Sequence, residues 1–303
     1  MMTADRRRIP RAVWVLGFVS LFMDMSSELV HAILPMYLTT VLGLSILAVG
    51  VIEGVAEATA SMLKVVSGFV SDRFRRRKQL ALLGYALAAL TKPVFPLADS
   101  AFGVVSARFV DRIGKGIRGA PRDAIVADVT PPSLRDAAYG LRQSLDTVGA
   151  FAGPLLAILF IWLLAGDLRL VLWVAVVPAI IAVVLLALGV DEPTPPAGSA
   201  RPTVALQFRQ IGRLPAGFWQ VVGLTALFSL ARLSEAFLVL RAQELQLALL
   251  WIPMVMIVMS VVYSTTSYPA GILAARVGRR ALLAASLFIL ALSELVLALT
   301  SGP

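Results

Sequence analysis

The sequence predicts an all-α membrane protein whose helices cross a lipid bilayer several times. Of its 303 residues, 59% are hydrophobic and the mean hydropathy is +0.87, whereas soluble domains are roughly 45–50% apolar. The segments 147–166 and 170–190 carry no charged residue, and each is close to the roughly 20 residues that a spanning helix needs. Two similar turns, at 68–78 and 271–280, each lie between two apolar segments. This internal repeat indicates two related halves.

Nine apolar segments are expected to span the bilayer as helices: 12–41, 46–71, 79–98, 101–124, 135–164, 168–190, 217–243, 248–275 and 280–300. Between the sixth and the seventh, the chain is rich in proline, glycine and polar residues, a composition that cannot sustain a packed core. We therefore expect an N-terminal bundle of six helices at 1–190, a cytoplasmic linker at 191–216 and a partial C-terminal bundle of three helices at 217–303.

The distribution of basic residues predicts that the N-terminus lies in the cytoplasm. Arginine and lysine are concentrated at the N-terminus and in the loops after the second, sixth and eighth spans. Loops with this excess stay on the cytoplasmic side of a membrane. The net charge of +9 therefore indicates orientation rather than a nucleic-acid partner. The first apolar run is long and carries Asp24 and Glu28, so we expect a retained helix rather than a cleaved secretory signal.

Charged side chains inside the predicted spans point to function, because each costs roughly 2.5–3.5 kcal/mol on insertion unless it faces a cavity or a partner. In the first span, Asp24, Glu28 and His31 share one helix face. The residues that we expect to bind protons are Asp24, Glu28, His31, Glu53 and Glu57, since a carboxylate shielded from water is protonated more readily. The residues that we expect to line a substrate or coupling cavity are Arg108, Asp111, Arg112, Lys115, Arg142, Asp146, Arg232 and Glu235.

Two other interpretations of these charges are open. Because both signs occur, many of them could be mutual ion pairs that hold helices together. Asp24, Glu28 and His31 are also suitable ligands for a metal. The chain has no cysteine and only one histidine, however, so no metal site and no cofactor are predicted.

Three short motifs resemble those of the major facilitator superfamily. The turn GFVSDRFRRRK resembles motif A through Gly68, Asp72, Arg73 and Arg77, with Arg75 where a glycine is usual. The segment RIGKGIRGA resembles motif B through Arg112 and Gly116. The segment TVGAFAGPLLA resembles motif C of proton-linked exporters through Gly149, Gly153 and Pro154, with Leu156 and Ala157 in place of the final glycines. In the second copy of motif A, Ala275 replaces the aspartate.

The resemblance implies a fold of two six-helix bundles that alternate between inward and outward access. It implies that motif A holds one access state closed by joining the loop between helices two and three to helices four and eleven, and that Arg112 takes part in proton coupling. It also implies a bacterial inner membrane location. Twelve helices are usual in that family, so helices ten to twelve have no counterpart here. We expect the chain to be a fragment that inserts into the membrane without catalysing coupled transport alone.

The function expected from the sequence is secondary active transport, with proton-coupled export of a small organic solute or drug. No segment fits the Gly-x-x-x-x-Gly-Lys-Ser/Thr pattern of a nucleotide-binding loop, so ATP is not expected as the energy source. Enzymatic chemistry is not expected, because a single histidine among apolar spans provides no convincing triad. The alternatives are an importer or facilitator of an organic anion, favoured by the arginine-rich fourth span, and a truncated membrane protein that transports nothing.

Overall fold

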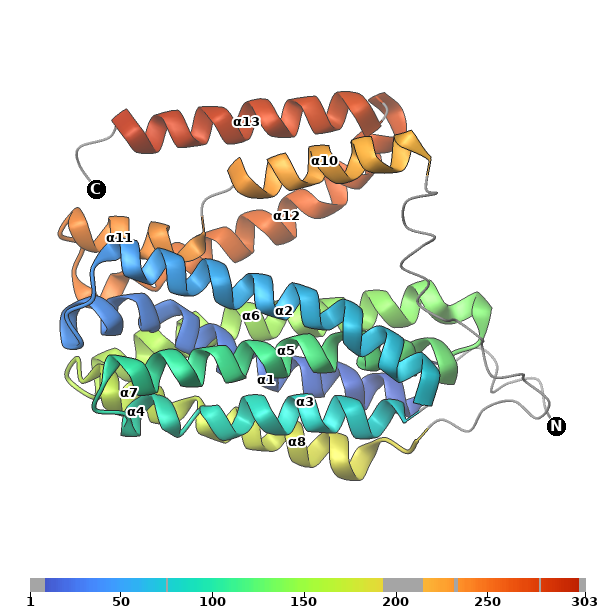
Figure 1. Cartoon of the computed structure of the whole chain (residues 1–303), viewed down its shortest axis with the longest axis horizontal. Helices are drawn as coiled ribbons and strands as arrows, with labels where there is room; N and C mark the ends of the chain where they lie inside the picture. Colours follow the sequence, from blue (N-terminus) through green and yellow to red (C-terminus); the bar gives the residue numbers. More distant parts are fainter. Residues whose placement is uncertain (1–8, 75, 193–214, 232–233, 278, 300–303) are drawn as a thin grey trace.

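The computed structural model describes residues 9–74, 76–192, 215–231, 234–277 and 279–299. Within these ranges, every regular element is a helix. Figure 1 shows the long helices running roughly side by side, in alternating directions. The second copy of motif A occupies the junction of the last two helices, and its side chains lie outside the described residues.

The first part of the chain forms a bundle of long helices joined by short turns. Its elements are α1 (Arg11–Met36), a π-helical turn (Tyr37–Val41), α2 (Ile46–Phe74), α3 (Arg77–Thr91), α4 (Val94–Leu97), α5 (Ala101–Val129), a 3-10 turn (Pro132–Leu134), α6 (Arg135–Leu163), α7 (Leu168–Val174) and α8 (Val176–Gly189). The elements of the later part are α10 (Ala216–Ala231), α11 (Glu235–Glu244), a 3-10 turn (Leu249–Trp251), α12 (Met254–Val277) and α13 (Arg279–Leu299).

All nine predicted spans contain helix, although several are divided. The third consists of α3 and α4, the sixth of α7 and α8, and the seventh of α10 and α11. Six helical segments of the described chain are long and apolar enough to cross a membrane. Helix α5 is long enough to cross a membrane, but it carries too many charged residues to count among these six apolar segments. The number of nine membrane spans therefore remains a prediction.

Glycines let the helices of the first bundle approach each other closely. A Cβ atom on Gly153 of α6 would lie 2.8 Å from backbone atoms of Met25 and Leu29 in α1, and one on Gly149 would overlap the carbonyl of Leu21. Small residues four positions apart lie on one helix face and allow this close approach. Helix α1 accordingly packs mainly along α6 and α8.

Glycines also let α5 pack closely between α2 and α3. A Cβ on Gly114 would lie 2.6 Å from the carbonyl oxygen of Gly84 in α3, and one on Gly116 would lie 2.7 Å from that of Ala60 in α2. The glycines of the motif B segment therefore place the charged face of α5 against both neighbours. This close packing positions the candidate site.

Large apolar side chains cover much of the outer surface of the bundle. Phe102 is 82% exposed, Leu90 and Trp162 are each 68% exposed, and many other apolar side chains lie outside the core. Water would make such a surface unfavourable, whereas lipid tails would not. The arrangement is that of an integral membrane protein that crosses the bilayer several times.

Candidate functional site

The centre of the first bundle holds a network of buried charged side chains around α5. Arg108 donates two hydrogen bonds to the carboxylate of Glu53 on α2, one of them from Nε to Oε1 at 2.9 Å. Lys92, which follows α3, lies 2.8 Å from Asp111 and also contacts Ser27 of α1. These four charges are almost entirely buried, so each depends on an opposite charge for its stability.

Arg112 connects this buried network to a cavity. Its guanidinium lies 3.2 Å from Asp111 and 3.1 Å from Glu57 on α2. The Glu57 carboxylate also lies 3.6 Å from Lys115. Because Asp111 is buried and Glu57 is exposed, the planar guanidinium joins two carboxylates in different surroundings, a geometry that a lysine cannot reproduce.

The cavity lies between the first bundle and the later helices, and its volume is about 490 Å³. Its walls come from α1, α5 and α6 on one side and from α11 and α12 on the other. Asp24, Glu28, Lys115, Asp146 and Glu235 contribute charged groups to it. Helix α12 adds the apolar and polar side chains of Met256, Met259, Ser260 and Tyr263. The cavity therefore presents both charged and apolar surface to an occupant.

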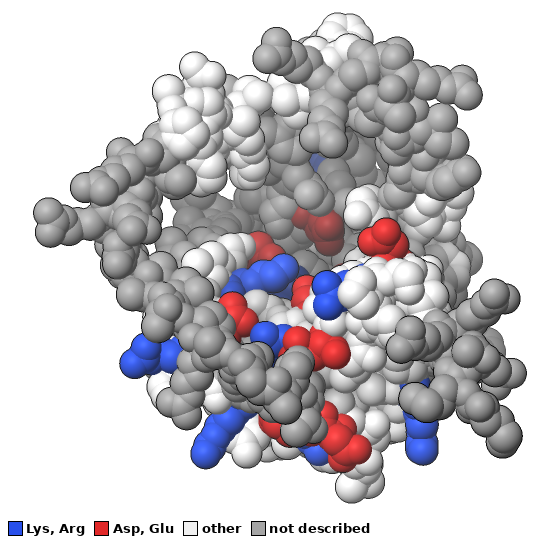
Figure 2. All heavy atoms as spheres, turned by 90° about the vertical axis from the view of Figure 1, so that its right-hand side faces the viewer, with Lys and Arg blue, Asp and Glu red and all other residues white. Residues whose placement is uncertain are grey.

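A second hollow, of about 260 Å³, adjoins Asp24, Lys115 and Asp146 and continues along α5. It is lined by more basic than acidic groups, since Lys64, Arg118 and Arg122 are added. Arg118 lies 3.9 Å from Asp24 and stacks over the ring of Tyr85. Seen from the end of the bundle at which the N-terminus lies, acidic and basic side chains gather around a hollowed surface (Figure 2).

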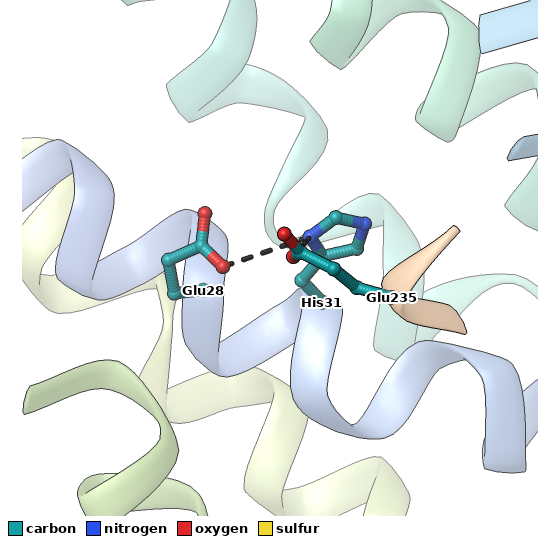
Figure 3. Close-up of side chains that lie close together, drawn as sticks. All are labelled: Glu28, His31 and Glu235. Carbon is teal, nitrogen blue, oxygen red and sulfur yellow. Dashed lines mark ion pairs between the residues drawn. The ribbon is translucent and has the colours of Figure 1, made fainter. Parts of the chain in front are cut away.

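His31 lies where three carboxylates from three helices converge. Its Nε2 is 3.3 Å from Glu53 of α2, and its Nδ1 is 3.6 Å from Glu28 of α1 and 4.0 Å from Glu235 of α11. Figure 3 shows Glu28 and Glu235 approaching the imidazole from different helices. The single histidine of the chain is thus in contact with both parts of the molecule.

The motif A turn is attached to the far end of α5. Arg77 lies 3.3 Å from Asp72 and 2.5 Å from Asp128, and it donates a hydrogen bond to the carbonyl of Ala124 at 3.0 Å. These contacts join the turn to the fourth predicted span, as the motif resemblance implies. Arg75 lies outside the described residues.

The structure brings most of the predicted site residues together. Arg142 and Asp146 form an ion pair of 3.4 Å within α6, and Arg122 of α5 lies 3.7 Å from the same carboxylate. Asp24, Glu28 and His31 share one face of α1 but have different partners. Asp24 lies near Arg118, whereas Glu28 lies near His31. Arg232 was also predicted for the site and lies outside the described residues.

Two residues of the network were absent from the sequence-based site. Lys92 could have been found as a charge near the end of an apolar span. Asp123 lies 3.2 Å from Arg122 and 3.7 Å from Arg142, and it could have been found as a further charge inside the predicted fourth span.

Comparison with known proteins agrees with this architecture. Residues 16–303 match the family model described as Major Facilitator Superfamily. An uncharacterized MFS-type transporter of Methanocaldococcus jannaschii is 33% identical over 283 residues, which cover 91% of this chain and 69% of that protein. The multidrug resistance protein MdtH of Proteus mirabilis is 30% identical over 160 residues, 53% of this chain and 37% of that protein.

Two groups of solved structures share the fold. A bacterial homolog of the human lysosomal transporter Spinster, in an inward-facing and occupied conformation, has a TM-score of 0.67 at 17% identity over 88% of this chain and 62% of that chain. A POT family transporter in complex with a thioalcohol-conjugated peptide has a TM-score of 0.58 at 20% identity over 73% of this chain and 45% of that chain. The chain thus spans less than two thirds of these solved structures.

Proposed function

The chain belongs to the major facilitator superfamily and is a multi-pass membrane transporter rather than an enzyme, and on that premise we propose that it couples the export of a small organic solute to proton movement. In this proposal the solute occupies the cavity between the first bundle and α11 and α12. Two parts would rock about it, an N-terminal bundle at 1–190 and a partial C-terminal bundle at 217–303, joined by a cytoplasmic linker at 191–216.

The observation that carries the proposal is the access of paired carboxylates to this cavity. Asp24 and Glu28 line it, and each lies near an ionisable partner, Arg118 for Asp24 and His31 for Glu28. Glu57 and Glu53 continue the acidic path along α2 toward the buried arginines. A proton that neutralises one of these carboxylates would weaken its ion pair, so protonation would change the contacts between helices.

In the proposal, a change in the contacts between helices affects the whole bundle through the motif A turn. Arg77 holds Asp72 and Asp128 together at the junction of α2, α3 and α5. In the proposal this cluster stabilises one access state, and its release permits the other. In the proposal, the N-terminus lies in the cytoplasm of a bacterial cell. The start of α1 and the basic junction of α2 and α3 lie at the same end of the bundle (Figure 1), and basic loops stay on the cytoplasmic side of a membrane.

Export is favoured over import by two observations. The relative from Proteus mirabilis is named a multidrug resistance protein. Gly149, Gly153 and Pro154 of α6 also resemble the exporter motif C, and the two glycines form the close contact with α1. Since α1 carries Asp24 and Glu28, this contact would transmit the protonation of those carboxylates to α6.

A second candidate function is the import or facilitated movement of an organic anion. The hollow along α5 is lined by Lys64, Lys115, Arg118 and Arg122. Arg118 is almost fully buried, and its Nη1 has no hydrogen-bond partner among the described residues. A carboxylate or phosphate of a substrate could accept that hydrogen bond.

Reconstitution into vesicles of known orientation tests both candidates. Candidate drugs and organic anions are added while a pH-sensitive dye follows proton movement. Asp24→Asn and Glu28→Gln are expected to abolish proton-linked flux without reducing the amount of folded protein. Asp136→Asn, at an exposed position in the first turn of α6, is the matched control. Wild-type proton movement in both cavity variants would refute the coupling role.

A further inference from the structure

Three metal-ligating side chains converge at the boundary between the two parts of the molecule. The imidazole of His31 and the carboxylates of Glu28 and Glu235 each offer one ligand atom, and these atoms lie within 4.8 Å of one another. Two of the residues come from the second half of α1 and the third from the first turn of α11 (Figure 3). The proposed proton-coupled transport does not require these three groups to act as a unit.

The contact with Glu53 determines which nitrogen of His31 carries a hydrogen. Glu53 receives two hydrogen bonds from the guanidinium of Arg108, so its carboxylate is ionised and can only accept hydrogen bonds. The Nε2 of His31, at 3.3 Å from Glu53, must therefore donate. In the neutral imidazole, this leaves the lone pair of Nδ1 directed toward Glu28 and Glu235.

A lone pair opposite two carboxylates is an unfavourable arrangement unless a cation lies between them. A proton on Nδ1 would need an oxygen at about 2.7–3.2 Å to form a good hydrogen bond. The contact of Nε2 with Glu53, at 3.3 Å, lies just outside that range, whereas the distances of 3.6 Å to Glu28 and 4.0 Å to Glu235 are too long for a hydrogen bond. Two ligands that each lie about 2.1 Å from one metal ion are about 3–4 Å apart, so both distances suit coordination better than a direct hydrogen bond.

We propose that Nδ1 of His31 and the carboxylates of Glu28 and Glu235 bind one divalent transition metal ion. The hydrogen bond from Nε2 to Glu53 matches the carboxylate support that metal-binding histidines usually have, which fixes the ring and increases its basicity. Arg108 in turn holds Glu53 in place. The ligands and their support thus come from α1, α2, α5 and α11.

The chemistry of the ligands selects the class of ion. One imidazole and two carboxylates suit Mn²⁺, Fe²⁺, Co²⁺ or Zn²⁺, whereas Mg²⁺ and Ca²⁺ prefer oxygen ligands throughout and Cu⁺ prefers sulfur. Glu28 and Glu235 line the cavity, so an ion can enter from it and water can complete the coordination. Because the ligands come from both parts of the molecule, a bound ion would stabilise the contact between α1 and α11.

Metal binding to purified protein tests this inference without any transport measurement. The untagged full chain in detergent is stripped with a chelator and titrated with Co²⁺, whose visible absorption bands report its ligands, and with Mn²⁺. We expect saturable binding of one ion per chain. His31→Ala, Glu28→Gln and Glu235→Gln should each weaken binding at least tenfold, and Glu53→Gln should weaken it about 10–100-fold, as for other supporting residues.

Glu244→Gln provides the matched control, because Glu244 lies on α11 but pairs with Arg241 away from the cluster. It should bind Co²⁺ as the unmodified protein does. A variant is compared only when it elutes as a single folded species, and the glutamine substitutions nearly preserve side-chain shape. Amide hydrogen exchange in α11 should slow when Co²⁺ is added, and this slowing should be lost in Glu235→Gln.

Several outcomes would overturn the inference. One is the absence of saturable binding, which would leave a proton as the cation at His31. Another is binding that persists unchanged in His31→Ala or Glu235→Gln, which would place the ion elsewhere. Displacement of Co²⁺ by equimolar Mg²⁺ or Ca²⁺ would exclude an imidazole ligand. Failure of proton-coupled transport alone would not affect these results, since binding is measured separately.

Discussion

The charged side chains around α5 form two groups that differ in their access to water. The buried group consists of Glu53, Lys92, Arg108 and Asp111, whose side chains are 1–4% exposed. The cavity group lines the cavity or the adjoining hollow and consists of Asp24, Glu28, Glu57, Lys115 and Asp146, whose side chains are 21–54% exposed. Both groups contain opposite charges on neighbouring helices.

Because of this difference in exposure, we expect the two groups to contribute differently to the stability of the fold and to transport. Breaking a buried pair leaves one charge without water or a partner, whereas an exposed pair contributes little to stability. We therefore expect the buried group to hold α2, α3 and α5 together, and the cavity group to remain available to protons and substrate. Arg112 contacts a member of each group, Asp111 and Glu57, so it links them.

The largest effect is expected from removing one member of the buried group. Lys92→Met removes the closest partner of Asp111, at 2.8 Å, and leaves this buried carboxylate with Arg112 at 3.2 Å, so the fold should be destabilised by about 3 kcal/mol. The measurement is the thermal midpoint of the protein in detergent, with the yield of folded protein. Lys115→Met in the cavity group is the control, and an equal loss in both variants would remove the distinction between the groups.

A smaller loss of stability is expected from enlarging a glycine at the contact between α6 and α1. Gly153→Ala places a Cβ 2.8 Å from backbone atoms of Met25 and Leu29, which forces the helices apart and should cost about 1–3 kcal/mol. Gly140→Ala on the same helix is the control, because a Cβ there meets no atom within 4 Å. Thermal unfolding of the two variants tests this, and equal midpoints would show that α1 can move away freely.

Arg112→Lys should affect transport more than stability. A lysine cannot contact Asp111 and Glu57 together through a planar fork, so the link between the two groups is weakened. We expect a loss of proton-linked flux of about tenfold, which corresponds to about 1.4 kcal/mol. Arg135→Lys, at an exposed position where α6 begins, is the control. If Arg112→Ala and Arg112→Lys both transport as fast as the original protein, Arg112 only stabilises the fold.

The smallest change in stability is expected within the cavity group. Glu57 is 54% exposed and lies 3.6 Å from Lys115, so Glu57→Gln should lower the free energy of unfolding by less than about 1 kcal/mol. High salt should reduce even this difference, since exposed charges are screened. Proton-linked flux should nevertheless fall. A stability loss like that of Lys92→Met would assign Glu57 to the buried group.

Much of the fold could be predicted from the order of residues along the chain. Apolar segments of sufficient length must become helices in a bilayer, because each backbone polar group needs a partner within its own segment. The close contact at Gly149 and Gly153 follows from their spacing, since small residues four apart lie on the same helix face. The pair of Arg142 and Asp146 also follows from helical spacing alone.

The partners of the charges were decided by tertiary structure. Helical periodicity places Asp24, Glu28 and His31 on one face, but the rotation and register of α2, α5 and α11 determine that His31 meets Glu53 and Glu235 while Asp24 meets Arg118. Lys92 joins Asp111 for the same reason. The sequence by itself determined the helices and their charged faces, because those depend on neighbouring residues. Only the packed bundle decided which charges are buried in pairs and which line the cavity, because those contacts join residues far apart in the chain.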